Sequence, residues 1–133
     1  MISIKLTSVI VNDQARALTF YTEMLGFVLK QDIPMGDARW LTVVSPADPD
    51  GVHLLLEPTG FEFSKTYQKA LYEAGVPLTA FAVDDVPAEY QRLMALGVTF
   101  RGEPTTGPGP ATATLDDTCG NLIQLFQVGQ TSQ

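Results

Sequence analysis

The chain is poor in the residues that most often build reactive sites. It has one cysteine, Cys119, and one histidine, His53, in 133 residues. A single cysteine excludes a disulfide within the chain and is compatible with a reducing compartment, so we expect a cytoplasmic location. Any Ser-His-Asp triad would have to use His53, and the G-x-S-x-G elbow is absent. Cys119 has no histidine near it in sequence, so we expect an inert thiol rather than a nucleophile.

Positive charge and long apolar runs are also scarce. Eight Lys and Arg residues stand against fifteen Asp and Glu residues, which gives a net charge of −7. This balance opposes binding of a phosphate backbone, so nucleic acid is not an expected partner. No segment approaches the roughly 20 apolar residues that span a bilayer, and no membrane association is expected. The first residues lack the pattern of a signal peptide, and the chain has neither a P-loop nor a dinucleotide fingerprint.

The residues that are present predict one folded domain. Hydrophobic residues make up 45% of the chain and charged residues 17%, which is typical of a folded protein rather than a disordered one. A chain of 133 residues buries roughly two thirds of its unfolded surface, enough for a real core. We therefore expect a single domain over residues 1–133.

One pattern occurs twice in this domain. The stretch VIVNDQARALTFYTEMLGF, residues 9–27, returns in similar form as FAVDDVPAEYQRLMALGVTF, residues 81–100. Asp13 and Asp85 stand 72 residues apart, and Gly26 and Gly97 stand 71 apart. Each copy predicts a strand, a helix capped by Asp and a glycine that ends the helix. The sequence therefore predicts two copies of one structural unit.

The rest of the sequence completes both units. Alternating patterns predict strands at 6–11, 27–33, 39–44 and 52–57 in the first half, and at 78–83, 98–102, 111–115 and 122–128 in the second. Between them a linker helix is predicted, with Ser64 as its cap, Gly75 as its end and Tyr67, Ala70, Leu71 and Ala74 as its apolar stripe. The prediction is an α+β domain of two tandem βαβββ units, at 4–58 and 77–128, joined by a helical linker at 59–76. The loop at 105–110, TTGPGP, is expected to border a binding site.

Four segments carry a resemblance to a known family: NDQARALTFYTEMLGF, RWLTVVSP, LLLEP and DDTCGNLIQLFQ. They resemble the vicinal oxygen chelate superfamily, which includes glyoxalase I, bleomycin resistance proteins and extradiol dioxygenases. The most specific part is D-x-x-x-A-x-x-F-Y followed by L-G-F. The resemblance implies paired βαβββ units with curved sheets around a cleft, and a homodimer.

The resemblance also implies where a metal would be held. Metal-dependent members use His, Gln or Glu from the first and last strand of each unit, donors that suit Mn, Fe, Ni or Zn. Here the first-strand positions fall on Leu6 and Leu78, which cannot coordinate a metal. The last strand of the second unit offers Gln124, and that of the first offers His53 or Leu55. At most two donors of four remain, so no tightly held metal is expected.

We expect the ligand pocket to include the following residues: Leu6, Trp40, His53, Glu57, Leu78, Phe100, Gln124 and Phe126. Each has a less specific interpretation. A lone histidine is often structural, a carboxylate before Pro58 is more often solvated than catalytic, and strand aromatics are more often core than ligand contacts. No catalytic residue is assigned.

Three functions remain open. The first is a binding protein, similar to the bleomycin-resistance branch, that captures a small, partly aromatic molecule in a cleft or dimer crevice without metal or any other cofactor. The second is an enzyme, a glyoxalase-type lyase or isomerase or a dioxygenase, with an atypical Ni, Mn, Fe or Zn site. The third is a non-catalytic association module whose cleft has closed into apolar core.

Overall fold

The first unit has the predicted element order. The computed structural model describes residues 1–128, so the last five residues of the expected domain lie outside the described part. The elements of this unit are β1 (Leu6–Val11), α1 (Gln14–Thr19), the π-helical turn η1 (Phe20–Met24), β2 (Val28–Met35), β3 (Ala38–Val44) and β4 (His53–Pro58). Strand β1 pairs in parallel with β4, and β4, β3 and β2 continue the sheet in antiparallel pairs, giving the order β1-β4-β3-β2.

The second unit is a shorter copy. Its elements are β5 (Thr79–Val83), α3 (Val86–Ala95), β6 (Thr112–Asp116) and β7 (Leu122–Gln127), and its sheet has the order β5-β7-β6. The α+β prediction with two repeated units is confirmed, but the strand predicted at 98–102 is wrong. That segment forms one isolated bridge, from Phe100 to Leu115. The ring of Phe100 packs edge-on against Tyr90 of α3, 4.7 Å away, so the segment follows the helix rather than the sheet.

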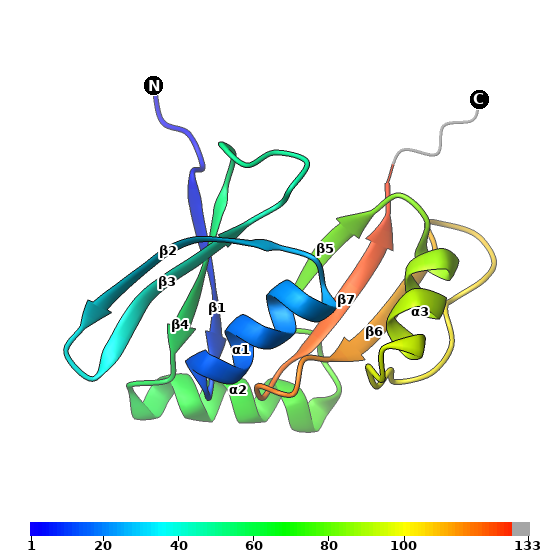
Figure 1. The fold of residues 1–133 in the computed structure, drawn as a ribbon. Coiled ribbons are helices and arrows are strands. Elements are labelled where there is room, and N and C mark those ends of the chain that lie inside the picture. The colour runs from blue at the N-terminus through cyan, green and yellow to red at the C-terminus, as the bar shows by residue number, and fades with distance from the viewer. Residues whose placement is uncertain (129–133) are drawn as a thin grey trace.

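The helix signals of the repeat are confirmed in both units. The side chain of Asp13 accepts a hydrogen bond from the Arg16 amide at 3.0 Å, and Asp85 does the same for Ala88 at 3.0 Å. Gly26 and Gly97 take φ angles of 90° and 92°, a region that glycine enters without strain. Figure 1 shows α1 between the two sheets, where it contributes to one core shared by both units.

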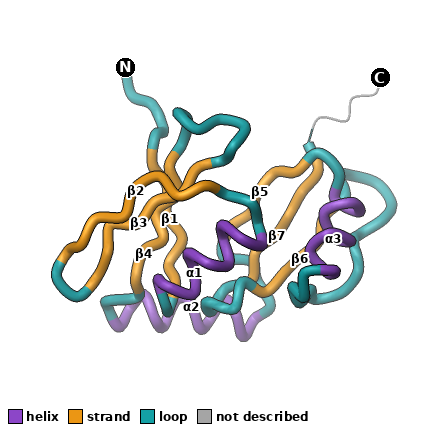
Figure 2. The backbone as a smooth tube through the Cα atoms, viewed as in Figure 1, coloured by secondary structure: helices purple, strands orange, loops and turns teal. Residues whose placement is uncertain are grey.

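The linker helix, α2 (Glu62–Ala74), differs from its prediction. Its N-cap is Phe61, which makes no side-chain capping hydrogen bond, and not Ser64. Its predicted stripe is wrong as well, because Tyr67, Ala70 and Ala74 are exposed while the polar Gln68 is buried. The helix runs beneath both sheets in Figure 2 and reaches them through Gln68.

A buried polar cluster explains this choice of face. We call Tyr21, Gln68, Asp117 and Asn121 the turn cluster, because it surrounds the turn between β6 and β7. The Gln68 amide donates to the carbonyls of Ile10 and Cys119 at 3.0 and 3.1 Å and to the side chain of Asn121 at 2.9 Å. A hydrogen-bonded amide satisfies buried backbone carbonyls that an apolar side chain would leave unpaired. Polar contacts therefore fix how α2 lies on the domain.

No helix in the described part of the chain is long and apolar enough to cross a membrane.

Candidate functional site

The first sheet has one covered face and one open face. Residues of one orientation, such as Val9, Leu41 and Leu56, are buried on the side of α1. Residues of the other orientation form what we call the open face. Strand register gives this orientation to Leu6, Ser8 and Ile10 of β1, Gln31 and Ile33 of β2, Trp40, Thr42 and Val44 of β3, and His53, Leu55 and Glu57 of β4. Thr42 and Val44 are nevertheless buried, so the accessible part of the face is formed by the other residues. The structure thus brings four predicted site residues onto one surface.

Polar contacts hold the aromatic rings of this face. The Trp40 indole nitrogen donates to the side chain of Gln31 at 3.0 Å, which fixes the ring plane. The hydroxyl of Thr42 lies 3.4 Å from His53 Nδ1, so one ring nitrogen of the histidine is engaged and Nε2 has no partner among residues 1–128. Sequence reasoning missed Gln31 and Thr42. Their alternation on β2 and β3 would have placed them beside the two rings.

The second sheet carries the other predicted residues. Gln124 pairs with Ala80 and Thr114, and Phe126 pairs with Ala82 and Thr112, on the side of this sheet that faces away from its core. Leu78 precedes β5 and lies near β1, since it lines a pocket of about 350 Å³ with Ser8, Ile10, Phe63, Ser64 and Tyr67. The aromatic residues of α2 in this pocket were not predicted.

Phe100 lies apart from these residues. It packs against the shared core and the ring of Tyr90, on the side of the second sheet that α3 covers. The predicted residues therefore fall into three groups, and the largest group is on the open face.

Strand register decides which first-unit residue corresponds to Gln124. Gln124 pairs with Ala80, which is 72 residues after Ser8, and Ser8 pairs with Leu55. The counterpart of Gln124 is therefore Leu55, while His53 pairs with Leu6. The donor positions implied by the resemblance are then three leucines, Leu6, Leu55 and Leu78, and one neutral amide. Such a set does not fit a divalent transition metal. Within residues 1–128 no three His, Cys, Asp or Glu side chains gather as metal ligands would.

The groups whose pKa burial raises lie away from the open face, in the turn cluster and at the neighbouring Cys119. Burial raises the pKa of Asp117, although hydrogen bonds from Tyr21 and Asn121 oppose that rise. Burial and the neighbouring Asp117 carboxylate raise the pKa of Tyr21 well above its usual value. Burial also raises the pKa of the Cys119 thiol to about 12, which keeps it protonated and unreactive at neutral pH. These groups stabilise a turn and are not exposed to a ligand on the open face.

The sequence matches one described family over most of its length. Residues 3–125 match the Glyoxalase/Bleomycin resistance protein/Dioxygenase superfamily. The chain belongs to this superfamily. The paired units and the two mixed sheets described above are its fold, and solved structures of the superfamily match them closely.

Three known proteins are similar to this chain over nearly its full length. The uncharacterized protein YurT of Bacillus subtilis is 53% identical, with 93% of this chain and 98% of YurT covered. UcmS2, whose crystal structure is known, is 30% identical to this chain in sequence. The two structures have a TM-score of 0.82, with 96% of this chain and 99% of UcmS2 covered. TnmS3 of Streptomyces sp. CB03234, an antibiotic binding protein, is 32% identical with a TM-score of 0.74, covering 97% and 98%.

Proposed function

We propose that the open face of the first sheet binds a small, partly aromatic molecule and that binding needs no metal or other cofactor. The observation that carries the proposal is the make-up of this face. Apolar side chains surround one indole ring, and the polar side chains of Gln31 and His53 stand beside it, while the buried hydroxyl of Thr42 contacts the His53 ring. Binding sites for small molecules have this composition, an apolar lining with few orienting polar groups.

The donor positions support binding without metal. Three leucines and Gln124 leave one neutral amide where metal-dependent relatives would supply four donors. Complete structural zinc sites contribute about 10–16 kcal/mol through about four ligands, so a site without most of them loses most of that free energy. The similarity to TnmS3, an antibiotic binding protein, supports the same ligand class.

We also propose that a second copy of the chain covers the open face and forms a crevice with it. All eight residues of β2 are exposed, and Ile33 of this strand is 48% exposed on the open face. An exposed edge strand with apolar residues tends to pair with another strand. A second copy of the chain, related by a twofold axis, can provide that strand. Sedimentation at micromolar concentration tests this. We expect a dimer, and a monomer of 14.4 kDa would contradict it.

Trp40 offers a direct assay for the ligand, because it is the single tryptophan of the chain. We expect metal-free bleomycin or the dye 8-anilinonaphthalene-1-sulfonate to change the Trp40 fluorescence, with and without a chelator. Leu6→Glu places a charge on the open face and should weaken binding about tenfold or more, since a buried unpaired charge is costly. Met94→Glu is the matched control, since Leu6 and Met94 are 46% and 47% exposed and Met94 lies on α3.

Two results would contradict this proposal. One is equal binding by the Leu6→Glu and Met94→Glu proteins. The other is a stoichiometric Ni, Mn, Fe or Zn ion that survives dialysis against a chelator and is lost in His53→Ala. The second result would favour a metal-dependent lyase or dioxygenase instead.

A further inference from the structure

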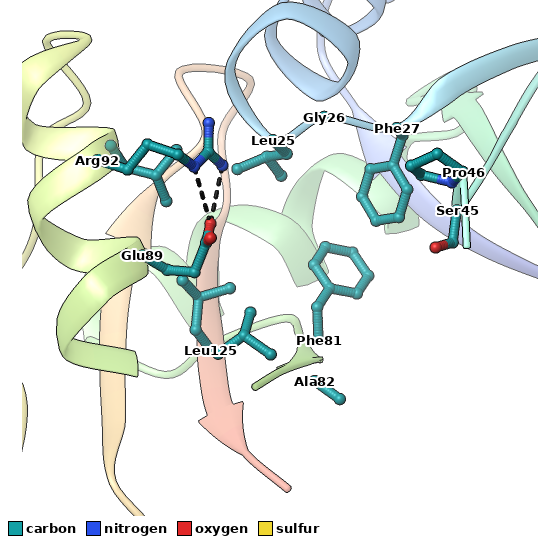
Figure 3. Close-up of a pocket in the computed structure, with 12 residues that line it drawn as sticks. Leu25, Gly26, Phe27, Ser45, Pro46, Phe81, Ala82, Glu89, Arg92 and Leu125 are labelled. Carbon is teal, nitrogen blue, oxygen red and sulfur yellow. Dashed lines mark hydrogen bonds and ion pairs between the residues drawn. The ribbon is translucent and has the colours of Figure 1, made fainter. Parts of the chain in front are cut away.

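Two pockets lie on the helix side of the domain, away from the open face. In each, the chain that leaves the helix of one unit meets the helix of the other unit. Residues 25–27 meet α3 around a pocket of about 180 Å³, the α3 pocket (Figure 3). Residues 96–98 meet α1 and η1 around a pocket of about 240 Å³, the α1 pocket. Because Gly26 and Gly97 are 71 residues apart, both pockets occupy the same place in the repeat.

The two pockets differ in charge. In the α3 pocket, Arg92 donates from Nε and Nη2 to one carboxylate oxygen of Glu89, at 3.1 and 2.8 Å, as the dashed lines of Figure 3 mark. In the α1 pocket, Arg16 donates from Nη1 to the carbonyl of Thr118 at 3.3 Å. Within residues 1–128 no acidic side chain forms an ion pair with Arg16. The guanidinium of Arg16 at the α1 pocket therefore has no ion-pair partner among the described residues.

The backbone around the α1 pocket is unusual in two places. Phe20 and Met24 line it from η1, where the Leu25 amide donates to the Phe20 carbonyl five residues back, at 3.1 Å. Such π-helical turns are rare and occur often at functional sites. Thr118 lines the same pocket with φ at 61°, and among residues 1–128 it is the one non-glycine residue with a positive φ. A β-branched residue in that region is strained, and strain of this kind gathers at binding sites.

The walls and the volume define the class of ligand. The side chains of Phe20, Met24 and Val98 give an apolar surface, and Thr19 and Thr99 add hydroxyl groups beside it. A volume of about 240 Å³ exceeds the ~150 Å³ of an apolar cavity that admits benzene and is below the ~300 Å³ at which drug-sized sites begin. It suits one ring or a short chain.

We propose that the α1 pocket is a second binding site, which takes a small carboxylate with an apolar body. The carboxylate pairs with the guanidinium of Arg16, whose fork of N–H groups matches two carboxylate oxygens. The apolar body lies on Phe20 and Met24. The α3 pocket does not take such a ligand, because the guanidinium of Arg92 is already paired with the carboxylate of Glu89. This site is separate from the open face, so it does not rest on the proposed function.

The test uses 3-phenylpropanoate as the probe and 3-phenylpropanamide as its uncharged counterpart. Each is titrated into the full chain while amide signals are followed in ¹H–¹⁵N correlation spectra. We expect 3-phenylpropanoate to shift the signals of Thr19, Gly97 and Thr99. The uncharged amide, or Arg16→Gln with the acid, should raise the Kd about tenfold or more, the usual worth of a hydrogen bond to a charged group. Arg92→Gln is the matched control and should leave the Kd unchanged.

A second variant blocks the α1 pocket while it leaves the charge of Arg16 in place. Thr19 is exposed on α1, so Thr19→Trp should fold and fill the pocket, and it should abolish the shifts at Gly97 and Thr99. Unchanged spectra of the unliganded variants away from residue 16 or 19 show that they are folded. Shifts centred on Trp40 and His53, or an equal Kd for the native chain and Arg16→Gln, would overturn the proposal. The location of the shifts thus distinguishes this site from the open face.

Discussion

The helices of the two units stand in equivalent positions, yet one of them sends a polar group into the other unit. Tyr21 and Leu93 are 72 residues apart and are 0% and 1% exposed, so the two side chains fill corresponding volumes of the core. The hydroxyl of Tyr21 donates to Asp117 of the second unit at 2.6 Å. Leu93 has no polar atom with which to return such a contact. The two positions of the repeat therefore both hold a buried side chain, but only the first unit forms a polar contact with the other unit from this position.

The asymmetry is concentrated at one turn. Asp117 accepts from the amides of Cys119 and Asn121 at 2.7 and 3.0 Å, and the linker residue Gln68 donates to the same turn. The first unit and the linker helix both reach this turn, so the turn cluster connects all three parts of the chain. We infer that the stability of the domain depends more on the turn of the second unit than on corresponding features elsewhere in the repeat.

Glycine substitutions should give the largest contrast. An alanine Cβ at Gly120 would lie 2.8 Å from the amide of Gln68, and φ there is 99°. A left-handed φ costs about 1–2 kcal/mol for alanine, and displacing the buried amide leaves polar groups unpaired at about 1–3 kcal/mol more. Gly97→Ala has a similar φ of 92° and nothing within 4 Å of the new Cβ. We expect urea unfolding to show a loss of about 3 kcal/mol or more for Gly120→Ala and about half as much for Gly97→Ala.

Equal losses at the two glycines would mean that backbone strain alone decides the effect. The turn cluster would then add nothing at Gly120, and the asymmetry between the units would be smaller than we infer.

Removing a hydroxyl from each unit gives the next largest contrast. Tyr21→Phe leaves the buried Asp117 carboxylate without one donor, a loss of about 1.5–3 kcal/mol for a hydrogen bond to a charged group. Tyr90→Phe is the control, because Tyr90 contributes ring packing against Phe100 and no hydroxyl hydrogen bond among the described residues. We expect its effect to stay within about 0.5 kcal/mol. Chemical denaturation of both proteins measures the difference, and similar losses would contradict the asymmetric link.

The smallest expected effect is a change in pH dependence. Burial raises the pKa of Asp117 above its ordinary value of 3.8, so the folded protein binds this proton more tightly than the unfolded chain does. The stability that this carboxyl contributes is therefore greatest below pH 3.8 and is lost as pH rises through the raised pKa, by about 1.4 kcal/mol for each unit of the rise. Asp117→Asn removes this titration. We expect the unfolding free energy of the native chain minus that of Asp117→Asn to fall as pH increases toward neutrality. A difference that rises with pH would mean that the hydrogen bonds outweigh burial.

Local chemistry made much of this fold predictable. The caps at Asp13 and Asp85 and the glycines at 26 and 97 act within one helical turn, so their sequence signals do not depend on the rest of the molecule. Strand alternation is equally local, since side chains in a strand alternate, and the structure puts the pocket candidates Leu6, Trp40, His53 and Glu57 on one face.

Several features that the sequence did not predict depend on contacts between residues far apart in the chain. Gln68 is buried because the carbonyls it satisfies belong to Ile10 and Cys119, 58 and 51 residues away. Ser64 does not cap α2, since the helix begins earlier, directly after Phe61. The π-helical turn at 20–24 also escapes prediction, because five residues are too few for a periodicity to separate it from an α-helix. The α1 pocket follows from these features and was not predicted.

The exposed strand β2 also bears on how newly made chains can aggregate. Its free edge and its apolar residues Val28, Leu29, Ile33 and Met35 are the features through which newly made chains join wrongly into β-rich aggregates. The strand carries its own protection, because Pro34 has no N–H group to offer a neighbouring strand and Lys30 and Asp32 place charge along the edge. We therefore expect these three residues to limit pairing of newly made chains through the free edge of β2.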